Sequence, residues 1–189
     1  MANVLLALHG FHSSPNSLKI QQMSAYLAKN HPDIIFIAPQ LPCLPAEMWQ
    51  VIEGVFAKHG KDKIAVMGSS LGGFLATKAA EQFHVKTVLI NPAVYPNRLL
   101  SYAGAQQHPY TLQHYIIDDT YLHQLEALSS TYLGTPQTCW VLLQEGDEVL
   151  DYQQGLERYK QCTITCEPGG NHSFSGFERF LPEIINFLF

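Results

Sequence analysis

Short runs of apolar residues recur along the chain and alternate with longer segments in which apolar and polar residues mix. Six runs have the length and the β-branched content of strands, namely residues 4–8, 34–38, 64–67, 87–90, 139–143 and 162–166. The first, Val-Leu-Leu-Ala-Leu, is apolar at every position, whereas a half-exposed strand would alternate with polar residues. The pattern therefore predicts a central sheet that is covered on both faces.

Helix-length segments follow most of these runs. Amphipathic patterns predict helices at 17–29, 46–58, 71–83, 120–128, 152–159 and 175–187. The last segment opens with Ser175-Gly176-Phe177-Glu178, which fits a capping box. Strands that alternate with helices form parallel sheets, so the chain is predicted to have an α/β fold with a mostly parallel six-stranded sheet.

One region interrupts the alternation of strands and helices. Between residues 90 and 139 no segment carries a strand signal, and connections this long are usually functional or disordered. Aromatic residues argue against disorder, and this region contains Tyr95, Tyr102, Tyr110, Tyr115, Tyr121 and Tyr132. We therefore expect a short helical lid at about 95–133, carried by a single domain that spans residues 1–189.

Composition narrows the possible partners and locations. The 189 residues are 47% hydrophobic, and 11 Lys+Arg against 16 Asp+Glu give a net charge of -5, which argues against binding to nucleic acid. The chain shows no signal-peptide pattern and no run of eighteen apolar residues. Its four cysteines form no CxxC pair, which is typical of free thiols. We expect a cytoplasmic protein without a membrane span, and composition leaves its oligomeric state open.

A serine motif follows the third apolar run. Gly68-Ser69-Ser70-Leu71-Gly72 fits G-x-S-x-G and lies between a predicted strand and a predicted helix. In that context the serine occupies a sharp turn that exposes its hydroxyl group. A motif centred on Ser69 would have Met67 and Leu71 at its glycine positions, and both side chains are too bulky for the close backbone packing of this turn. Ser70 is therefore the candidate nucleophile, and a serine in an ordinary turn is the alternative.

A serine hydroxyl is a weak nucleophile and needs a base, for which imidazole is best suited. His172 ends the glycine-containing loop between the last predicted strand and the closing helix, where enzymes with this serine motif carry their base. A solvated loop histidine is the alternative. His31, His59 and His84 lie near the ends of predicted helices, and His9 is interpreted as an anchor.

Four carboxylates follow the fifth predicted strand. Asp147 comes directly after the glycine that ends the strand, so its short side chain is placed to reach the far imidazole nitrogen. Asp151 stands at the start of the next predicted helix, where an N-cap role explains it. Asp147 is the candidate partner of His172 and Asp151 is the alternative. The order serine, aspartate, histidine agrees with the motif.

Acyl transfer passes through an oxyanion that backbone N–H groups stabilise. The amide of Leu71, next to the candidate nucleophile, is one predicted donor. The second is predicted to be the Phe11 amide, from the His9-Gly10-Phe11 loop that follows the first strand. This loop contains a single glycine and no Walker lysine, so it is not expected to cradle phosphate.

Together these motifs resemble the YqiA-type esterase family of small bacterial α/β-hydrolases. The similarity covers nearly the whole chain and rests on His9-Gly10-Phe11, Ser13-Ser14-Pro15, 68–73, Asn91-Pro92-Ala93-Val94, 146–152, Gly169-Gly170, His172 and Gly176-Phe177-Glu178. It implies an α/β-hydrolase fold, an esterase acting on acyl esters or thioesters, and no metal or organic cofactor. It also implies that Ser70, Asp147 and His172 are catalytic. Many relatives have aspartate and alanine where this chain has Asn171 and Ser173.

For this architecture, with strands numbered along the chain, we expect the order 2-1-3-4-5-6 and a site at the carboxyl ends of the strands. Two other functions stay open. An acyl-CoA thioesterase would need positive charge near the site, for which Lys19 and Arg98 are the few candidates. A binding module without chemistry is the second, although it would have no need of a complete set of catalytic residues.

Overall fold

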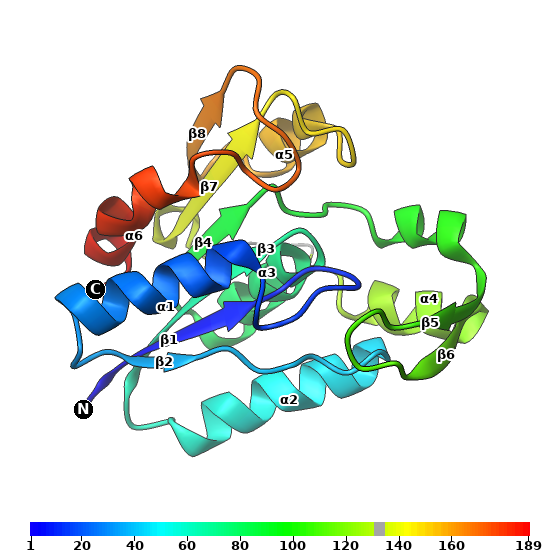
Figure 1. The fold of residues 1–189 in the computed structure, drawn as a ribbon, viewed down its shortest axis with the longest axis horizontal. Coiled ribbons are helices and arrows are strands. Elements are labelled where there is room, and N and C mark those ends of the chain that lie inside the picture. Colours follow the sequence, from blue (N-terminus) through cyan, green and yellow to red (C-terminus); the bar gives the residue numbers. More distant parts are fainter. Residues whose placement is uncertain (131–134) are drawn as a thin grey trace.

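Six parallel strands form the central sheet of the computed structural model, which describes residues 1–130 and 135–189, with the backbone alone at 96–98 (Figure 1). They are β1 (Asn3–Leu8), β2 (Ile35–Ile37), β3 (Lys63–Ser69), β4 (Thr87–Ile90), β7 (Cys139–Gln144) and β8 (Thr163–Glu167). Their spatial order is β2-β1-β3-β4-β7-β8. Because β7 and β8 are the fifth and sixth strands of this sheet, the predicted order 2-1-3-4-5-6 is confirmed.

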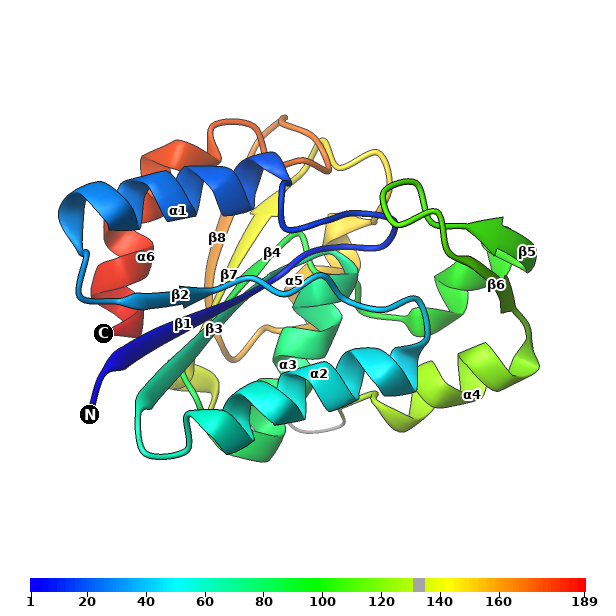
Figure 2. The same ribbon diagram turned by 60° about the horizontal axis from the view of Figure 1, so that its bottom comes forward.

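Helices cover both faces of the sheet, as Figure 2 shows. One face carries α1 (Leu18–Asn30) and α6 (Leu181–Leu188), and the other carries α2 (Pro45–Lys58), α3 (Leu71–Phe83) and α5 (Tyr152–Arg158). In β1, Leu5 and Ala7 pack with the first group, whereas Val4, Leu6 and Leu8 pack with the second. A strand buried on both sides has no solvent-facing position, which explains its apolar sequence.

The excursion at 95–133 differs from its prediction. It contains the 3₁₀ turn η1 (Pro96–Tyr102), an antiparallel hairpin of β5 (Gly104–Gln107) and β6 (His114–Ile117), and helix α4 (Asp119–Ala127). The predicted short helical lid is therefore only partly right, because η1 and α4 are helical but a hairpin lies between them. The β5 sequence Gly-Ala-Gln-Gln has low strand propensity and becomes a strand by pairing with β6. Tyr132 and Leu133, the last predicted lid residue, lie outside the described residues.

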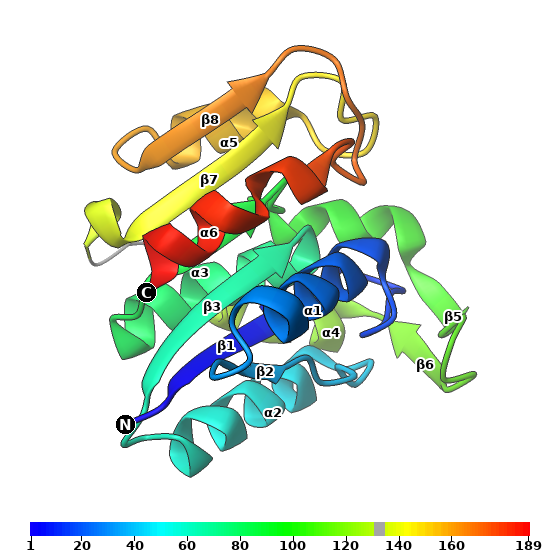
Figure 3. The ribbon, with the colours of Figure 1, turned by 60° about the vertical axis from the view of Figure 1, so that its left-hand side comes forward.

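The last helix also begins differently from its prediction. A 3₁₀ turn, η3 (Phe177–Phe180), precedes α6, which Figure 3 shows beside α1 on the same face of the sheet. The residue before η3 is Gly176 (φ 75°), and no side chain caps this turn, so the predicted capping box was wrong. Proline fits the first turn of a helix because it has no N–H group to leave unpaired, and Pro182 lies in the first turn of α6.

His31, His59 and His84 lie at the C-caps of α1, α2 and α3, as predicted. All four cysteines are free thiols. Among the helices of the described residues, none is both long enough and apolar enough to cross a membrane.

Candidate active site

Ser70 lies in the abrupt turn between β3 and α3. Its backbone adopts φ 55° and ψ -122°, a conformation that is rare for a residue with a side chain. Its N–H group donates to the carbonyl of Ile90 at the end of β4 (3.1 Å), and its own carbonyl accepts from the amide of Ala93 (3.0 Å). The neighbouring strand therefore holds Ser70 in its strained conformation.

Two glycines make this turn possible because backbone passes where their side chains would be. A Cβ atom at Gly68 would overlap the carbonyl of Gly72, and a Cβ atom at Gly72 would overlap the carbonyl of Leu8 in β1. The two glycines of the G-x-S-x-G motif are thus required by close backbone packing. This agrees with the predicted position of Gly68 and Gly72 on either side of Ser70 in the motif.

Ser70, His172 and Asp147 form a continuous chain of hydrogen bonds. Nε2 of His172 lies 3.0 Å from Oγ of Ser70, and Nδ1 of the same ring lies 2.8 Å from Oδ2 of Asp147. The side chain of Asp147 is 2% exposed and that of His172 is 22% exposed. The three side chains selected from the sequence therefore meet, and Nε2 is placed to accept the proton of the serine hydroxyl.

Asp147 is held in its charged form by its hydrogen bonds. Burial acts to raise the pKa of this carboxyl, but hydrogen bonds from His172, Leu150 and Val149 more than offset it, so the pKa lies below its ordinary value. The amides of Val149 and Leu150 both donate to Oδ1, at 2.9 and 2.8 Å. The alternative, Asp151, is instead the N-cap of α5, where it accepts from the amide of Gln153 (3.0 Å).

Two buried amide side chains fix the loop that carries His172. Asn91, at the end of β4, donates from Nδ2 to the carbonyls of Asn171 (3.0 Å) and His172 (3.2 Å), and its Oδ1 accepts from the amide of Gln144 (3.0 Å). Gln144, at the end of β7, accepts from the amides of Asn171 (3.1 Å) and Ser175 (2.9 Å). Each of the two residues is 2% exposed.

Sequence reasoning did not assign a role to Asn91 or Gln144. The available signal was a polar residue directly at the carboxyl end of a buried strand, where solvent is already excluded. A buried amide must find hydrogen-bond partners, and here those partners belong to the loop at 171–175.

Charged side chains complete the hold on this loop. Glu148 accepts from the amide of His172 at Oε2 (2.9 Å), and Lys19 donates from Nζ to the carbonyl of Ser173 (2.9 Å). These bonds, like those from Asn91 and Gln144, reach backbone atoms of the loop. The departures at Asn171 and Ser173 from the resembled family therefore leave this framework intact.

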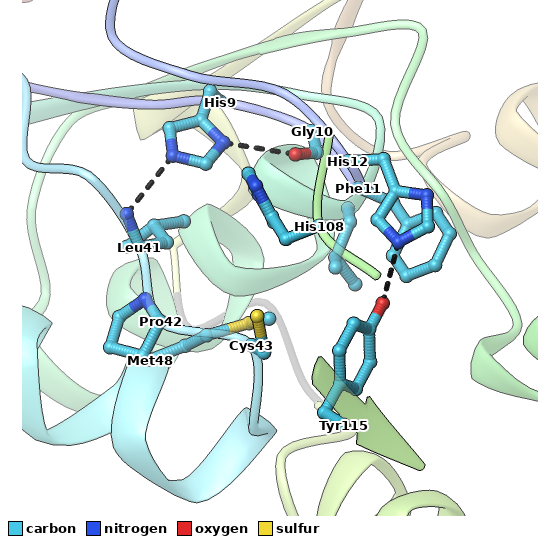
Figure 4. Close-up of a pocket in the computed structure, with 11 residues that line it drawn as sticks. His9, Gly10, Phe11, His12, Leu41, Pro42, Cys43, Met48, His108 and Tyr115 are labelled. Carbon is cyan, nitrogen blue, oxygen red and sulfur yellow. Dashed lines mark hydrogen bonds between the residues drawn. The ribbon is translucent and has the colours of Figure 1, made fainter. Parts of the chain in front are cut away.

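The loop between β1 and α1 passes over Ser70. A Cβ atom at Gly10 would lie only 3.1 Å from Cβ of Ser70, so glycine allows this close approach without a shift of either residue. His9, 4% exposed, anchors the loop, as its interpretation required: Nδ1 donates to the carbonyl of Gly10 (2.9 Å), and Nε2 accepts from the amide of Leu41 (3.0 Å; Figure 4). Burial lowers the pKa of His9, opposed by the bond to Gly10, which agrees with a neutral ring.

The same loop is tied to the hairpin of the excursion. Nε2 of His12 lies 2.7 Å from the hydroxyl of Tyr115 on β6, and the His12 ring stacks on Phe11 with centroids 4.0 Å apart (Figure 4). His108, 4% exposed, accepts from the amides of Tyr110 and Thr111 in the hairpin turn. Hairpin and loop are therefore in direct contact beside the Ser70 turn.

Two cavities border both Ser70 and His172. The larger, about 560 Å³, has mostly apolar walls, including Phe74, Leu99, Tyr102 and Leu150. The smaller, about 270 Å³, is lined by Lys19 and by Ser13, Ser17 and Ser173. Phe11 lines both cavities and Leu71 lines the larger, so the two predicted oxyanion donors lie beside Ser70, and their role stays a prediction.

Within the described residues, no three His, Cys, Asp or Glu side chains gather as metal ligands would.

Solved structures with the same architecture define the fold class. Est1E from Butyrivibrio proteoclasticus with ferulic acid bound matches with a TM-score of 0.74 and 14% identity, over 98% of this chain and 87% of that one. Mouse alpha/beta hydrolase domain-containing protein 10 matches with a TM-score of 0.75 and 16% identity, over 97% of this chain and 88% of that one. An α/β serine hydrolase without lid from Xanthomonas campestris matches with a TM-score of 0.64 and 15% identity, over 98% of this chain and 82% of that one. The chain thus has the α/β-hydrolase fold.

Family membership is more specific than fold. The model of the Uncharacterised protein family (UPF0227) matches residues 4–189, so the chain belongs to this family. The match extends over nearly the full sequence and confirms the YqiA-type resemblance.

Proposed function

We propose that this protein is a serine esterase that hydrolyses carboxylic acyl esters through a Ser70–His172–Asp147 triad. The hydrogen-bonded chain from Ser70 through His172 to Asp147, at the wall of an apolar cavity, carries the proposal. The esterases and serine hydrolases among the structural matches support it through their shared fold. Residues 1–189 act as one domain, with the 95–133 excursion as its lid.

The mechanism begins with proton transfer. Nε2 of His172 accepts the proton of Ser70 as Oγ attacks the acyl carbonyl carbon, and Asp147 stabilises the imidazolium that forms. The amides of Phe11 and Leu71 hold the oxyanion of the tetrahedral intermediate. When the intermediate collapses, the protonated His172 transfers its proton to the leaving alcohol and Ser70 keeps the acyl group.

Water completes the reaction by the same steps. His172 accepts a proton from water, hydroxide adds to the acyl carbonyl, and the carboxylic acid leaves as His172 returns the proton to Ser70. The apolar cavity is suited to the acyl chain because its walls are carbon-rich, and its volume lies in the range of small-molecule sites.

A fluorophosphonate probe tests this proposal without knowledge of the substrate. Such a probe reacts with an activated serine, so the wild type is expected to label. Ser70→Ala should abolish labelling, and His172→Ala and Asp147→Asn should weaken it strongly. Ser69→Ala is the matched control because Ser69 neighbours Ser70 and lies outside the hydrogen-bonded chain.

Two results would contradict the proposal. A folded wild type that does not label would favour a binding module that retains the fold without chemistry. Labelling that survives Ser70→Ala would assign the nucleophile to another residue. A thioesterase would pass this labelling test as well, and the relative turnover of matched acyl esters and acyl-CoA thioesters distinguishes it from an esterase.

A further inference from the structure

The two cavities beside Ser70 differ in charge, because Lys19 lines the smaller one and no lysine or arginine is among the described residues that line the larger one. Both are bordered by Phe11, Ser70 and His172, so a substrate whose carbonyl carbon is held at Ser70 can extend into both. An ester has two substituents, the acyl chain and the alcohol. If the acyl chain occupies the apolar cavity, the alcohol occupies the smaller one.

Lys19 gives the smaller cavity its charge. This residue lies in the first turn of α1, and its half-buried side chain lines the cavity together with Ser70. One hydrogen bond, to the carbonyl of Ser173, is made by its Nζ, and an ammonium group has three hydrogens to donate. The first turn of α1 contains no acidic residue that would neutralise Lys19 locally.

The remaining polar side chains of this cavity are suited to an oxyanion. Ser13, Ser17 and Ser173 line it, and a serine hydroxyl can donate a hydrogen bond to a carboxylate or phosphate oxygen. The charge of Asp147 acts on Lys19, but this carboxylate is already bound to His172 and to two backbone amides. Lys19 therefore retains charge that an incoming anion can use.

We propose that the cavity lined by Lys19, Ser13, Ser17 and Ser173 is a leaving-group subsite that takes an alcohol carrying an anionic group, a carboxylate or a phosphate. This inference rests on the proposed esterase function and narrows its substrate class. Because Lys19 and Ser70 line one cavity of about 270 Å³, the anion sits only a few bonds from the ester oxygen. The phosphates of a coenzyme A thioester lie many bonds from the thioester group, so Lys19 would not bind them.

Lys19 also has a purely structural role available to it, and the test must separate the two. Its bond to the carbonyl of Ser173 helps to hold the loop of His172. Loss of that bond alone would disturb His172 and slow every substrate equally. Recognition of an anion would instead affect charged substrates selectively, mainly through KM.

The test compares esters with the same acyl chain and nearly the same shape. In the carboxylate arm, 3-butyryloxypropanoate is compared with 3-butyryloxypropanamide, which is neutral. In the phosphate arm, 2-butyryloxyethyl phosphate is compared with glycerol monobutyrate. We expect wild-type kcat/KM to be about tenfold higher for at least one anionic ester than for its neutral partner, the effect of one charge-assisted hydrogen bond. The arm with the larger ratio identifies the anion.

Three variants assign this preference to Lys19. Lys19→Met should abolish it: loss of the bond to Ser173 slows both esters to the same extent and cancels in their ratio, whereas KM should rise for the anionic ester alone. Lys19→Arg should restore most of the preference because it keeps the charge. Lys29→Met is the matched control, since Lys29 is exposed in the last turn of the same helix.

The preference should also depend on pH. Burial lowers the pKa of Lys19 to about 8, although the charge of Asp147 opposes the shift. The ammonium form binds the anion, so the anionic-to-neutral ratio should fall as pH rises from 7 to 9. His172 lines the same cavity as Lys19, and the charge of Asp147 acts on Lys19; both residues act on both substrates alike, so their effects cancel in the ratio.

The outcomes distinguish this inference from the esterase proposal. Turnover of the neutral ester that depends on Ser70 supports the esterase, and its absence contradicts the esterase. With turnover present, equal rates for anionic and neutral partners in both arms would overturn the subsite. Equal losses for both esters in Lys19→Met would overturn it too, because they would leave Lys19 only its bond to Ser173.

Discussion

The loop of His172 and the 95–133 excursion are both placed around Ser70, but they are held in different ways. The loop is fixed by the buried side-chain amides of Asn91 and Gln144, which form hydrogen bonds with its backbone. The excursion exposes large apolar side chains, including Tyr110 (62%) and Leu112 (63%), and reaches the β1–α1 loop through His12 and Tyr115. Satisfied buried polar groups tolerate little displacement, whereas exposed segments rearrange easily. We therefore expect substitutions at the sheet edge to change mainly kcat, and substitutions in the excursion to change mainly the acyl-chain preference.

The largest effect is expected from Asn91→Ala, which breaks the hold on His172. It removes two donors to the loop and leaves the amide of Gln144 without its acceptor. We expect kcat to fall by about ten- to a hundredfold because small misplacements of a catalytic base are costly. The free energy of unfolding should fall by about 1–3 kcal/mol, which denaturant titration measures.

Asn30→Ala is the matched control for this change. The Asn30 amide also donates to a backbone carbonyl, that of Tyr26 (2.9 Å), but on the exposed end of α1. Its loss should leave kcat unchanged. Wild-type kcat in a folded Asn91→Ala protein would show that the loop keeps His172 in place without this amide.

A smaller effect is expected in the excursion, where Leu99 and Leu100 are adjacent but face different surroundings. Leu99 lines the apolar cavity, whereas Leu100 is 52% exposed. Leu99→Ala removes carbon contacts from the cavity wall, so kcat/KM for an octanoyl ester should fall about fivefold, and that for an acetyl ester much less. Leu100→Ala should change neither. An equal loss for both esters would place the acyl chain outside this cavity.

The sequence predicted which three side chains meet at the sheet edge better than it predicted the residues that hold them there. Ser70, Asp147 and His172 each follow a predicted strand, and carboxyl ends of parallel strands share one edge, so local signals were enough to bring them together. The bond between Asn91 and the loop of His172 joins residues eighty positions apart. Such contacts depend on how the loops fold back, which no local pattern encodes.

The hairpin was missed for a related reason. In β6, Tyr115 and Ile117 are buried while His114 and Ile116 are exposed, a period of two that four residues display too briefly to identify a strand. Its partner β5 has no apolar pattern of its own. Strand formation here follows from pairing, so the helical lid predicted from a long connection without a strand signal was only partly right.

The smallest effect is expected at the contact between the two regions. Tyr115→Phe removes the hydroxyl that lies 2.7 Å from Nε2 of His12. His12 directly follows Phe11 in the chain, and its backbone adopts a left-handed conformation (φ 50°). Without this bond the Phe11 amide should be held less firmly over the oxyanion. We expect kcat to fall about two- to fourfold with acyl-chain preference unchanged, the size of one neutral hydrogen bond. Tyr110→Phe, on the exposed hairpin turn, is the control. A change in chain-length preference instead of kcat would mean that the excursion shapes the acyl cavity without acting on the oxyanion loop.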